Sequence, residues 1–212
     1  MRIGIIGASG KAGSLILKEA VERRHEVTAI VRNKAKIENK SVKIIEKDVF
    51  DLKSEDVKDF DVVVNAFGAP PEKSNLHIEA GKVVFKVFKG APNTRLVYVG
   101  GAASLYVDEA KTVKLIETPD FPEAYKPTAS AMLKNYENLE KANGFQWTYI
   151  CPAGFFDPNG KKTGSYKINK DVLVLNSKGE SYISYADYAI AMLDEIENPK
   201  FNNAKVSVVG EN

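Results

Sequence analysis

The chain begins with a short apolar segment that leads directly into a glycine-rich turn and then into a helical pattern. Residues 2–6 are rich in isoleucine, as expected of a strand that is buried on both faces. Glycines follow at a spacing of three, at Gly7, Gly10 and Gly13. Small and apolar residues then recur at helical spacing from 12 to 20. This opening predicts a strand, a tight turn and a helix, in that order.

Strand and helix patterns alternate along the rest of the chain. Further strands are expected at 26–31, 42–46, 61–64, 95–99, 145–151, 172–175, 181–183 and 205–209. Helices are expected at 76–87, 128–143 and 186–196, and Ser184 and Asp187 precede the last of them in the form of a capping box. The alternation predicts the α/β class, with a Rossmann-like, doubly wound parallel sheet and helices on both faces. No linker or repeat interrupts it, so we expect residues 1–212 to form one domain with a small C-terminal substrate region.

Two segments are less regular and suggest where a substrate would lie. Residues 102–127 contain three prolines and follow the expected strand at 95–99. A segment beyond the carboxyl end of a strand suits a substrate-facing loop or a lid. Residues 152–185 hold only short strand signals. We expect the substrate side to consist mainly of 102–127 and 152–185.

The opening strand, glycine turn and helix are an arrangement that presents backbone N–H groups and the positive end of a helix to a phosphate. In dinucleotide-binding proteins the glycines permit the turn, the approach of the pyrophosphate and the packing of helix on strand. The spacing here is Gly-x-x-Gly-x-x-Gly, not Gly-x-Gly-x-x-Gly, and an ordinary glycine-rich turn is the alternative. We interpret it as an NAD(P)-binding turn, with expected contacts at Gly7, Ser9, Gly10, Lys11, Ala12 and Gly13.

The end of the second expected strand distinguishes NAD from NADP in such proteins. An acidic residue there binds the free ribose hydroxyl of NAD, and an arginine accommodates the 2′-phosphate of NADP. Arg32 stands at this point, and residues 29–35 contain no Asp or Glu. Its planar guanidinium can pair with a phosphate, so we expect NADP(H) to be preferred over NAD(H). The alternative is that Arg32 is a solvated residue at a strand end.

Further cofactor contacts are expected where the third and fourth strands end. Asp48 and Val49 follow the third strand, beside the expected position of the adenine, although an Asp that opens a turn explains the same pattern. Ala66, Phe67 and Gly68 follow the fourth strand, where the chain passes the ribose and pyrophosphate and small residues allow close approach.

Charge and composition argue against several other classes of function. The 30 basic and 28 acidic residues give a net charge of +2, so we expect no nucleic-acid partner. Cys151 is the single cysteine and follows an apolar run, which favours a buried thiol, and the two histidines are far apart, which argues against a metal site. Acidic residues interrupt a loose basic stretch, which we interpret as a solvated face: Lys34, Lys36, Lys40 and Lys43.

The expected location is the cytoplasm. No apolar run approaches the ~20 residues that a membrane-spanning helix needs, so no membrane partner is expected. Residues 2–6 predict a core strand where a leader peptide would have its charged start. The oligomeric state stays open, because no expected helix has a surplus apolar face.

Five motifs in order along nearly the whole chain resemble those of the atypical short-chain dehydrogenases. The chain is more similar still to bacterial NmrA-like NAD(P)H-binding proteins, which are often called NADH-flavin reductases. The resemblance implies a Rossmann fold, bound NAD(P)H and a further cofactor contact at Pro152. The motifs are Gly7-x-x-Gly10-x-x-Gly13, Val31-Arg32-Asn33, Asp48-Val49, Val97-Tyr98-Val99-Gly100-Gly101-Ala102 and Ile150-Cys151-Pro152-Ala153-Gly154-Phe155-Phe156, and Ser184-Tyr185-x-Asp187-Tyr188-Ala189 follows them.

The chain departs from the wider superfamily in its catalytic motif. Working short-chain dehydrogenases use Tyr-x-x-x-Lys on the helix after the fifth strand, with the tyrosine as general acid. Tyr125 and Tyr136 are followed four positions on by Ala and Glu. Tyr166 and Lys170 match in spacing but fall in a later polar stretch with strand character. Carbonyl reduction by a Tyr–Lys pair is therefore not expected.

A reaction that needs no acid from the protein fits these features better. Hydride transfer from a nicotinamide to a flavin or quinone requires mainly stacking and a short distance. We therefore expect an NADPH-dependent oxidoreductase that acts on a small-molecule acceptor, with FMN or FAD as candidate substrates. Ser104 and Tyr125 are the candidate catalytic residues, and the alternative for Ser104 is a plain loop serine. An apolar slot for the acceptor, or else simple core packing, is expected from Phe67, Phe155 and Phe156.

Two other classes of function remain as alternatives. A non-enzymatic NADP(H)-binding redox sensor that signals through a partner, as NmrA-like regulators are thought to do, would equally lack the Tyr–Lys pair. A sugar-nucleotide epimerase or dehydratase would require that pair, and usually a larger C-terminal region than the ~60 residues after Cys151.

Overall fold

The computed structural model describes residues 1–211, and its core is an eight-stranded sheet. The strand order is β3-β2-β1-β4-β5-β6-β10-β8, and all neighbours are parallel except β10 and β8. The expected doubly wound parallel sheet is thereby confirmed. The strands are β1 (Arg2–Ile6), β2 (Glu26–Val31), β3 (Lys43–Glu46), β4 (Val62–Asn65), β5 (Arg95–Val99), β6 (Trp147–Cys151), β8 (Tyr166–Lys170) and β10 (Ala204–Gly210).

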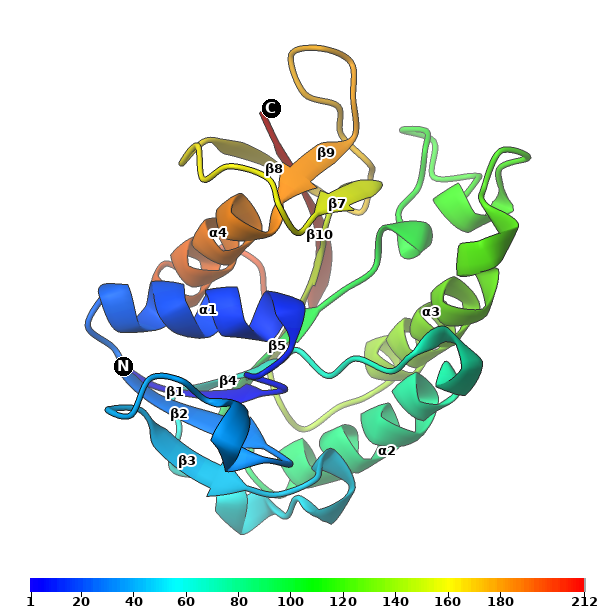
Figure 1. The fold of residues 1–212 in the computed structure, drawn as a ribbon. Helices are drawn as coiled ribbons and strands as arrows, with labels where there is room; N and C mark the ends of the chain where they lie inside the picture. The colour runs from blue at the N-terminus through cyan, green and yellow to red at the C-terminus, as the bar shows by residue number, and fades with distance from the viewer. Residues whose placement is uncertain (212) are drawn as a thin grey trace.

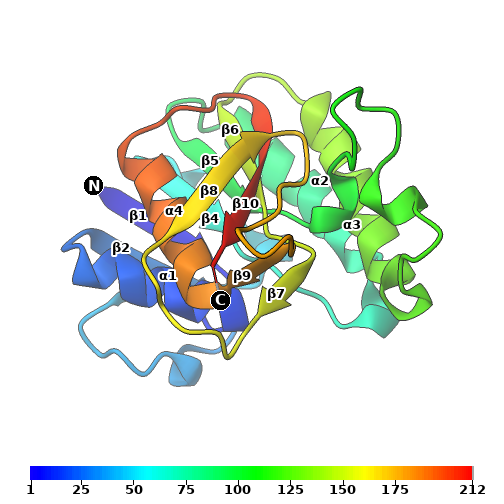
Figure 2. The same cartoon turned by 90° about the horizontal axis from the view of Figure 1, so that it is seen from above.

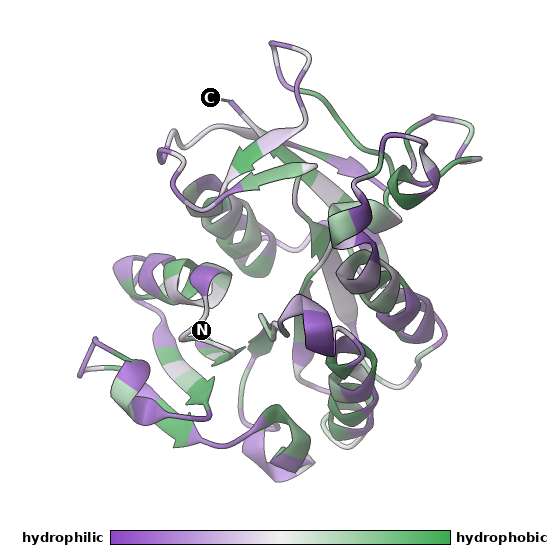
Figure 3. Cartoon of the chain, turned by 45° about the vertical axis from the view of Figure 1, so that its right-hand side comes forward, coloured by the Kyte–Doolittle hydropathy of each residue, from purple (hydrophilic) through white to green (hydrophobic). Residues whose placement is uncertain are grey.

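Two pairs of helices cover the sheet, one pair on each face (Figure 1 and Figure 2). α1 (Lys11–Glu22) packs against α4 (Tyr185–Glu197), and α2 (Leu76–Lys89) packs against α3 (Lys126–Glu140). Each pair contributes to its own apolar core. The helices carry both polar and apolar colours in Figure 3, as expected of helices with one buried face. Among residues 1–211, no helix is long and apolar enough to cross a bilayer.

The strand order reverses at β1, which lies between β2 and β4. In open α/β sheets, ligands bind outside the carboxyl ends of the strands at such a reversal. Of the strands beside it, β4 is buried throughout, with its three valines at most 2% exposed, and β2 is buried after its first residue. Because these strands are buried on both faces, the carboxyl end of β1, where the glycine turn begins, has a fixed position in the sheet.

Two expected strands in the C-terminal half differ from the structure. The strand expected at 145–151 begins at Trp147, and the Phe145 ring before it packs against two rings of α2. The prediction of a strand at 172–175 is wrong, since Val172 forms only an isolated bridge.

Two strands are absent from the expected strands, although the polar stretch that forms the first of them has strand character in the sequence. One is β8, a largely polar strand that pairs antiparallel with β10. The other is the short strand β7 (Phe155–Asp157), which pairs in parallel with β9 (Tyr182–Ser184), near the expected strand at 181–183. The helix expected at 128–143 begins earlier, at Lys126, because a proline is tolerated in a first helical turn.

Asp187 fastens a loop to the start of α4. The Ser184 cap is confirmed, since its Oγ accepts a hydrogen bond from the N–H of Asp187 at 2.9 Å. The buried Asp187 carboxylate accepts hydrogen bonds from the N–H of Thr163 (2.9 Å), the hydroxyl of Thr163 (2.8 Å) and the N–H of Gly164 (2.8 Å). Sequence suggests a reciprocal capping box, but the carboxylate instead ties the chain between β7 and β8 to the helix.

Replacing Asp187 is expected to destabilise the C-terminal half. Asp187→Ala removes a buried carboxylate that accepts three hydrogen bonds from residues 163 and 164, so we expect the free energy of unfolding to fall by ~3 kcal/mol. Thr163→Ala is the matched control, because it removes one donor and leaves the carboxylate paired, and should cost ~1 kcal/mol. Urea unfolding measures both. An equal loss in the two variants would show that the carboxylate has no special role.

Candidate functional site

The turn after β1 requires glycine at two positions. Gly7 has a φ of +75°, and a Cβ there would lie 2.6 Å from the carbonyl oxygen of Ala66. A Cβ on Gly13 would lie 2.2 Å from the carbonyl oxygen of Gly7. Both distances are far inside van der Waals contact. Helix α1 can therefore rest directly on the turn only because Gly13 has no side chain.

The N-terminus of α1 is open at this turn. Gly10 is the N-cap, no side chain caps the helix, and the first turn contains no acidic residue. The first helical hydrogen bond runs from the N–H of Ser14 to the carbonyl of Gly10 (2.9 Å). The N–H groups of Lys11, Ala12 and Gly13 therefore have no acceptor within the helix. Together with the positive helix end, these donors form a cradle suited to a phosphate.

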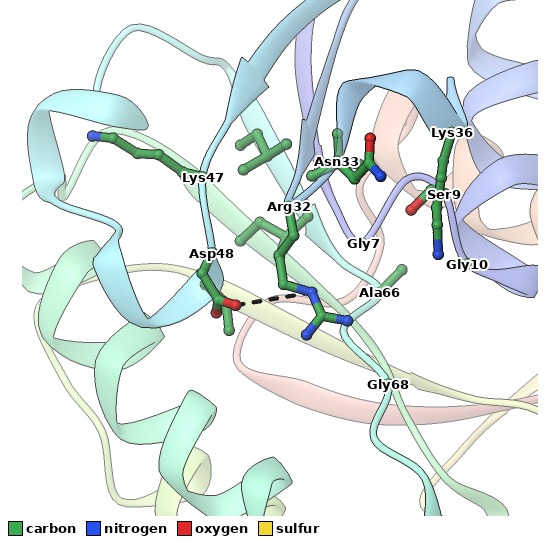
Figure 4. A pocket seen from close by; sticks show the side chains of 14 residues that line it. Gly7, Ser9, Gly10, Arg32, Asn33, Lys36, Lys47, Asp48, Ala66 and Gly68 are labelled. Carbon is green, nitrogen blue, oxygen red and sulfur yellow. Dashed lines mark ion pairs between the residues drawn. The ribbon is translucent and has the colours of Figure 1, made fainter. Parts of the chain in front are cut away.

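A pocket of about 410 Å³ lies beside this cradle, where β1, β2 and β4 end (Figure 4). Eight of the residues expected to contact the cofactor line it: Gly7, Ser9, Gly10, Arg32, Asp48, Val49, Ala66 and Gly68. Six other residues line it as well: Ile6, Ile30, Val31, Asn33, Lys36 and Lys47. Segments far apart in sequence thus converge at the reversal of strand order, and the pocket combines apolar walls with cationic groups.

Arg32 reaches into the pocket from the end of β2 (Figure 4). Its side chain is 77% exposed, and its Nε lies 3.8 Å from Oδ2 of Asp48, too far for a hydrogen bond. Asp48 is oriented by its own turn, because its Oδ1 accepts a hydrogen bond from the N–H of Phe50 at 3.1 Å. The turn-opening role considered for Asp48 is therefore present, and the Arg32 guanidinium keeps donors available for an anion.

Lys36 is exposed, as expected of the basic stretch, but it also lines the pocket. Lys34 pairs with Glu46 at 3.4 Å, whereas Lys36 has no ion-pair partner in the described chain and lines the pocket. Asn33 caps the short 3₁₀ turn that carries Lys36. Figure 4 shows the Lys36 side chain on the same side of the pocket as Ser9. In the sequence, Asn33 could have identified Lys36 as a pocket residue, because an asparagine that caps a short turn indicates that the chain bends there.

The two candidate catalytic residues do not line this pocket. Ser104 is 2% exposed, and its hydroxyl donates a hydrogen bond to the carbonyl of Gly101 at 3.0 Å. Tyr125 is 67% exposed and immediately precedes α3. The structure therefore brings neither hydroxyl to the phosphate cradle. Cys151 lies 3.5 Å from Ser104 Oγ, and burial raises the pKa of its thiol to about 12, so it is a core thiol as expected.

The aromatic candidates divide into packed and exposed side chains. Phe67 packs edge-on against two neighbouring rings, at centroid distances of 6.2 and 5.7 Å, and does not line the pocket. Phe156 lies against the ring of Tyr185, with centroids 3.8 Å apart. Pro152 is buried behind the end of β6. Of these side chains, Phe155 is the exposed one, at 61%, and offers an apolar surface beside β7.

The other chemical features of the sequence lie elsewhere in the fold. Tyr166 and Lys170 are on the edge strand β8, and the Tyr166 hydroxyl donates a hydrogen bond to Asp194 at 2.7 Å. Within residues 1–211, no three His, Cys, Asp or Glu side chains are grouped so that they could hold a metal ion.

Comparison with known proteins assigns the chain to a family. A model of NAD(P)H-binding proteins matches residues 7–199, from the glycine turn through α4. The chain belongs to the NAD(P)H-binding family. The match includes every strand that ends at the pocket except β1, and the open cradle supplies the backbone donors that binding a dinucleotide requires.

Several relatives cover the whole chain. The uncharacterized protein YwnB of Bacillus subtilis (strain 168) is 58% identical over 211 residues, covering 100% of this chain and 99% of that protein. The crystal structure of SP1627 from Streptococcus pneumoniae TIGR4, named as a candidate NADH-flavin reductase, is 42% identical with a TM-score of 0.94, and each chain is covered in full. A candidate epimerase from Bacteroides thetaiotaomicron is 34% identical with a TM-score of 0.86, over 100% of this chain and 97% of that one.

Alanine at Gly10 and at Gly13 is expected to separate cofactor binding from stability. A methyl on Gly13 meets the Gly7 backbone, so α1 must move, and we expect a loss of ~1–3 kcal/mol in unfolding free energy together with loss of NADPH binding. A methyl on Gly10 would lie 3.2 Å from the carbonyl oxygen of Gly7 and would line the pocket, so the free energy of unfolding should change little.

For Gly10→Ala we expect the Kd for NADPH to rise by about tenfold or more, equivalent to ~1.4 kcal/mol. Fluorescence titration with NADPH, alongside urea unfolding of both variants, separates the two effects. Wild-type affinity in Gly10→Ala would contradict the assignment of this turn as the phosphate cradle.

Proposed function

We propose that the protein is an NADPH-dependent reductase that delivers hydride to a flavin or quinone-like acceptor. The observation that carries the proposal is a single pocket in which the open N-terminus of α1 meets Arg32 and Lys36. Membership of the NAD(P)H-binding family supports the cofactor class. The similarity to SP1627, named as a candidate NADH-flavin reductase, supports the acceptor class.

The residues of the pocket divide the work of holding the cofactor. The backbone N–H groups at the start of α1 bind the pyrophosphate, since they have no acceptor within the helix. Arg32 and Lys36 bind the 2′-phosphate, which favours NADPH over NADH. Asp48 and Val49 lie beside the adenosine. When bound, NADPH supplies the hydride, and the protein contributes binding, orientation and exclusion of water.

The acceptor side lies beyond the ends of β5 and β6, in residues 102–127 and 152–185. A flavin or quinone requires a flat apolar surface, and the exposed ring of Phe155 beside Tyr182, with centroids 5.7 Å apart, provides one. Water can protonate the reduced acceptor, so no buried acid is needed. That Ser104 and Tyr125 contact the acceptor stays a prediction. Ser104 would act through the backbone turn that its hydroxyl closes, and Tyr125 through its exposed ring.

A redox sensor is the second candidate function. It is favoured by the placement of the two candidate hydroxyl groups, one committed to a backbone carbonyl and the other outside the pocket. A sensor must bind NADP⁺ and NADPH with different affinities, because only differential binding shifts a conformational equilibrium. A reductase has no such requirement.

Oxidation of NADPH by the purified protein tests the proposal. We expect turnover that depends on added FMN, FAD or a soluble quinone and exceeds a blank without protein. The Gly13→Ala variant serves as the control, because its cradle is displaced. Absence of turnover with every acceptor, in samples that bind NADPH in the same titration, would contradict the reductase. Unequal affinities for NADP⁺ and NADPH in those samples would then favour the sensor.

Substitution of the two pocket cations tests the cofactor preference. Arg32→Ala should weaken NADPH binding by about 10- to 100-fold and leave NADH binding nearly unchanged, because a charged hydrogen bond to the 2′-phosphate is lost. Lys36→Gln should act in the same direction by about 5-fold, since a single point charge is removed. Lys34→Gln is the matched control, because its amine already pairs with Glu46.

Calorimetric binding of 2′,5′-ADP and of 5′-ADP isolates the 2′-phosphate from any reaction. We expect the wild type to prefer 2′,5′-ADP, and Arg32→Ala to lose most of that preference. An unchanged ratio of NADPH to NADH affinity in Arg32→Ala would remove the basis for the NADP assignment.

A further inference from the structure

Lys205 is a buried cation that forms no ion pair among the described residues, since Asp171 and Glu140 act on it only from beyond ion-pair distance. It is the second residue of β10 and is 2% exposed, and the described residues place no carboxylate within ion-pair distance of it. The other deeply buried cation, Arg95, pairs with Glu195. Transfer of a charged group from water into the protein interior is costly unless the group is paired. Lys205 therefore has a position that hydrophobic packing alone would assign to an apolar residue.

Three groups surround the Lys205 ammonium. Its Nζ donates a hydrogen bond to the carbonyl oxygen of Ser104. It also lies 5.0 Å from the centroid of the Tyr106 ring and 4.7 Å from that of Tyr136. Ring faces attract cations, and more strongly where water is excluded. Two aromatic rings and one carbonyl thus hold the ammonium in place, and burial lowers the pKa of Lys205.

The carbonyl that Lys205 holds belongs to the turn that follows β5. Ser104 closes this turn, because its hydroxyl donates to the carbonyl of Gly101 at 3.0 Å, and the N–H of Leu105 donates to the carbonyl of Ala102 at 2.9 Å. The turn leaves the carboxyl end of β5, the edge of the sheet at which ligands bind in this architecture. Lys205 thus connects the interior of β10 to backbone at the ligand-binding edge.

We propose that Lys205 is a positioning residue that holds the turn at 100–104 in the place where it forms a wall of the acceptor site. This inference rests on the proposed reductase function. Lys205 lies opposite Tyr149 of β6, in the C-terminal half of the sheet. The phosphate cradle and the pocket beside it belong to β1, β2 and β4. Loss of the Lys205 ammonium should therefore impair use of the acceptor and spare binding of NADPH.

Three variants isolate this contact. Lys205→Met keeps an aliphatic stem and removes the ammonium, an exchange that buried charges often tolerate. Lys205→Arg keeps a cation and a donor and should restore part of the effect. Ser54→Ala is the matched control, because it removes a part-buried hydrogen bond of 2.8 Å to the carbonyl of Val87 in α2, away from the turn.

Amide hydrogen exchange and steady-state kinetics provide independent readouts. In Lys205→Met we expect exchange at 100–106 to accelerate by about tenfold or more, because the turn loses its anchor. We expect kcat with the acceptor to fall by about 10- to 100-fold, as a misplaced site does, while the Kd for NADPH stays within about twofold. Ser54→Ala should leave both exchange at 100–106 and kcat at wild-type values.

Unchanged exchange at 100–106 in Lys205→Met overturns the proposal whatever the turnover. Faster exchange with wild-type kcat also overturns it, because the placement of the turn would then not matter to the reaction. If the wild type binds NADPH but reduces no acceptor, the proposed function fails and the acceptor role of Lys205 fails with it; exchange still decides whether the ammonium anchors the turn. Lys205→Gln, with the same expected changes, replaces Lys205→Met should that variant not fold.

Discussion

The contact between the first turn of α1 and the Gly7 backbone positions the rest of the cofactor side. Because Gly13 has no side chain, the helix rests directly on the turn and points its unpaired N–H groups at the pocket. The other end of α1 is fastened to α4 by Arg23, which bonds Asp194 at 2.6 Å and Glu197 at 2.8 Å. A helix held at both ends presents its N-terminus at a defined height above the sheet, which is what recognition of a phosphate by backbone groups requires.

The middle of the sheet is fastened by two buried cations. Arg95 begins β5 and donates to the side chain of Glu195 and, at 3.1 Å, to the carbonyl of Phe201. Lys205 acts beyond the other end of the same strand, at the carbonyl of Ser104. A buried charged contact is costly to break, so these two contacts define where β5 begins and where the chain goes after it. β5 lies between β4, which ends at the pocket, and β6, which leads into the proposed acceptor side.

The segments that we propose for the acceptor side are built differently from the main sheet. The pair β7 and β9 forms a separate two-stranded sheet, and the segment from 102 to 125 contains only short turns and an isolated bridge. Such segments can change without disturbing the main sheet, which explains how relatives with one fold carry names of different activities, a flavin reductase and an epimerase. The cofactor class follows from the scaffold that these relatives share.

The sequence by itself determined the features whose physical causes are local. Each of these features depends on a few neighbouring residues, so its pattern can be recognised along the chain. They are the glycine spacing, the β-branched strands, the order of strands and helices, the Ser184 cap and the arginine after β2. Only the tertiary structure decided that β7 pairs with β9 and that β8 pairs with β10. It also decided the placement of Lys36 in the pocket and the burial of Ser104. The contact of Lys205 with Ser104 joins residues 101 positions apart. Such contacts leave no local pattern, because the chain brings the two groups together only when the sheet has formed.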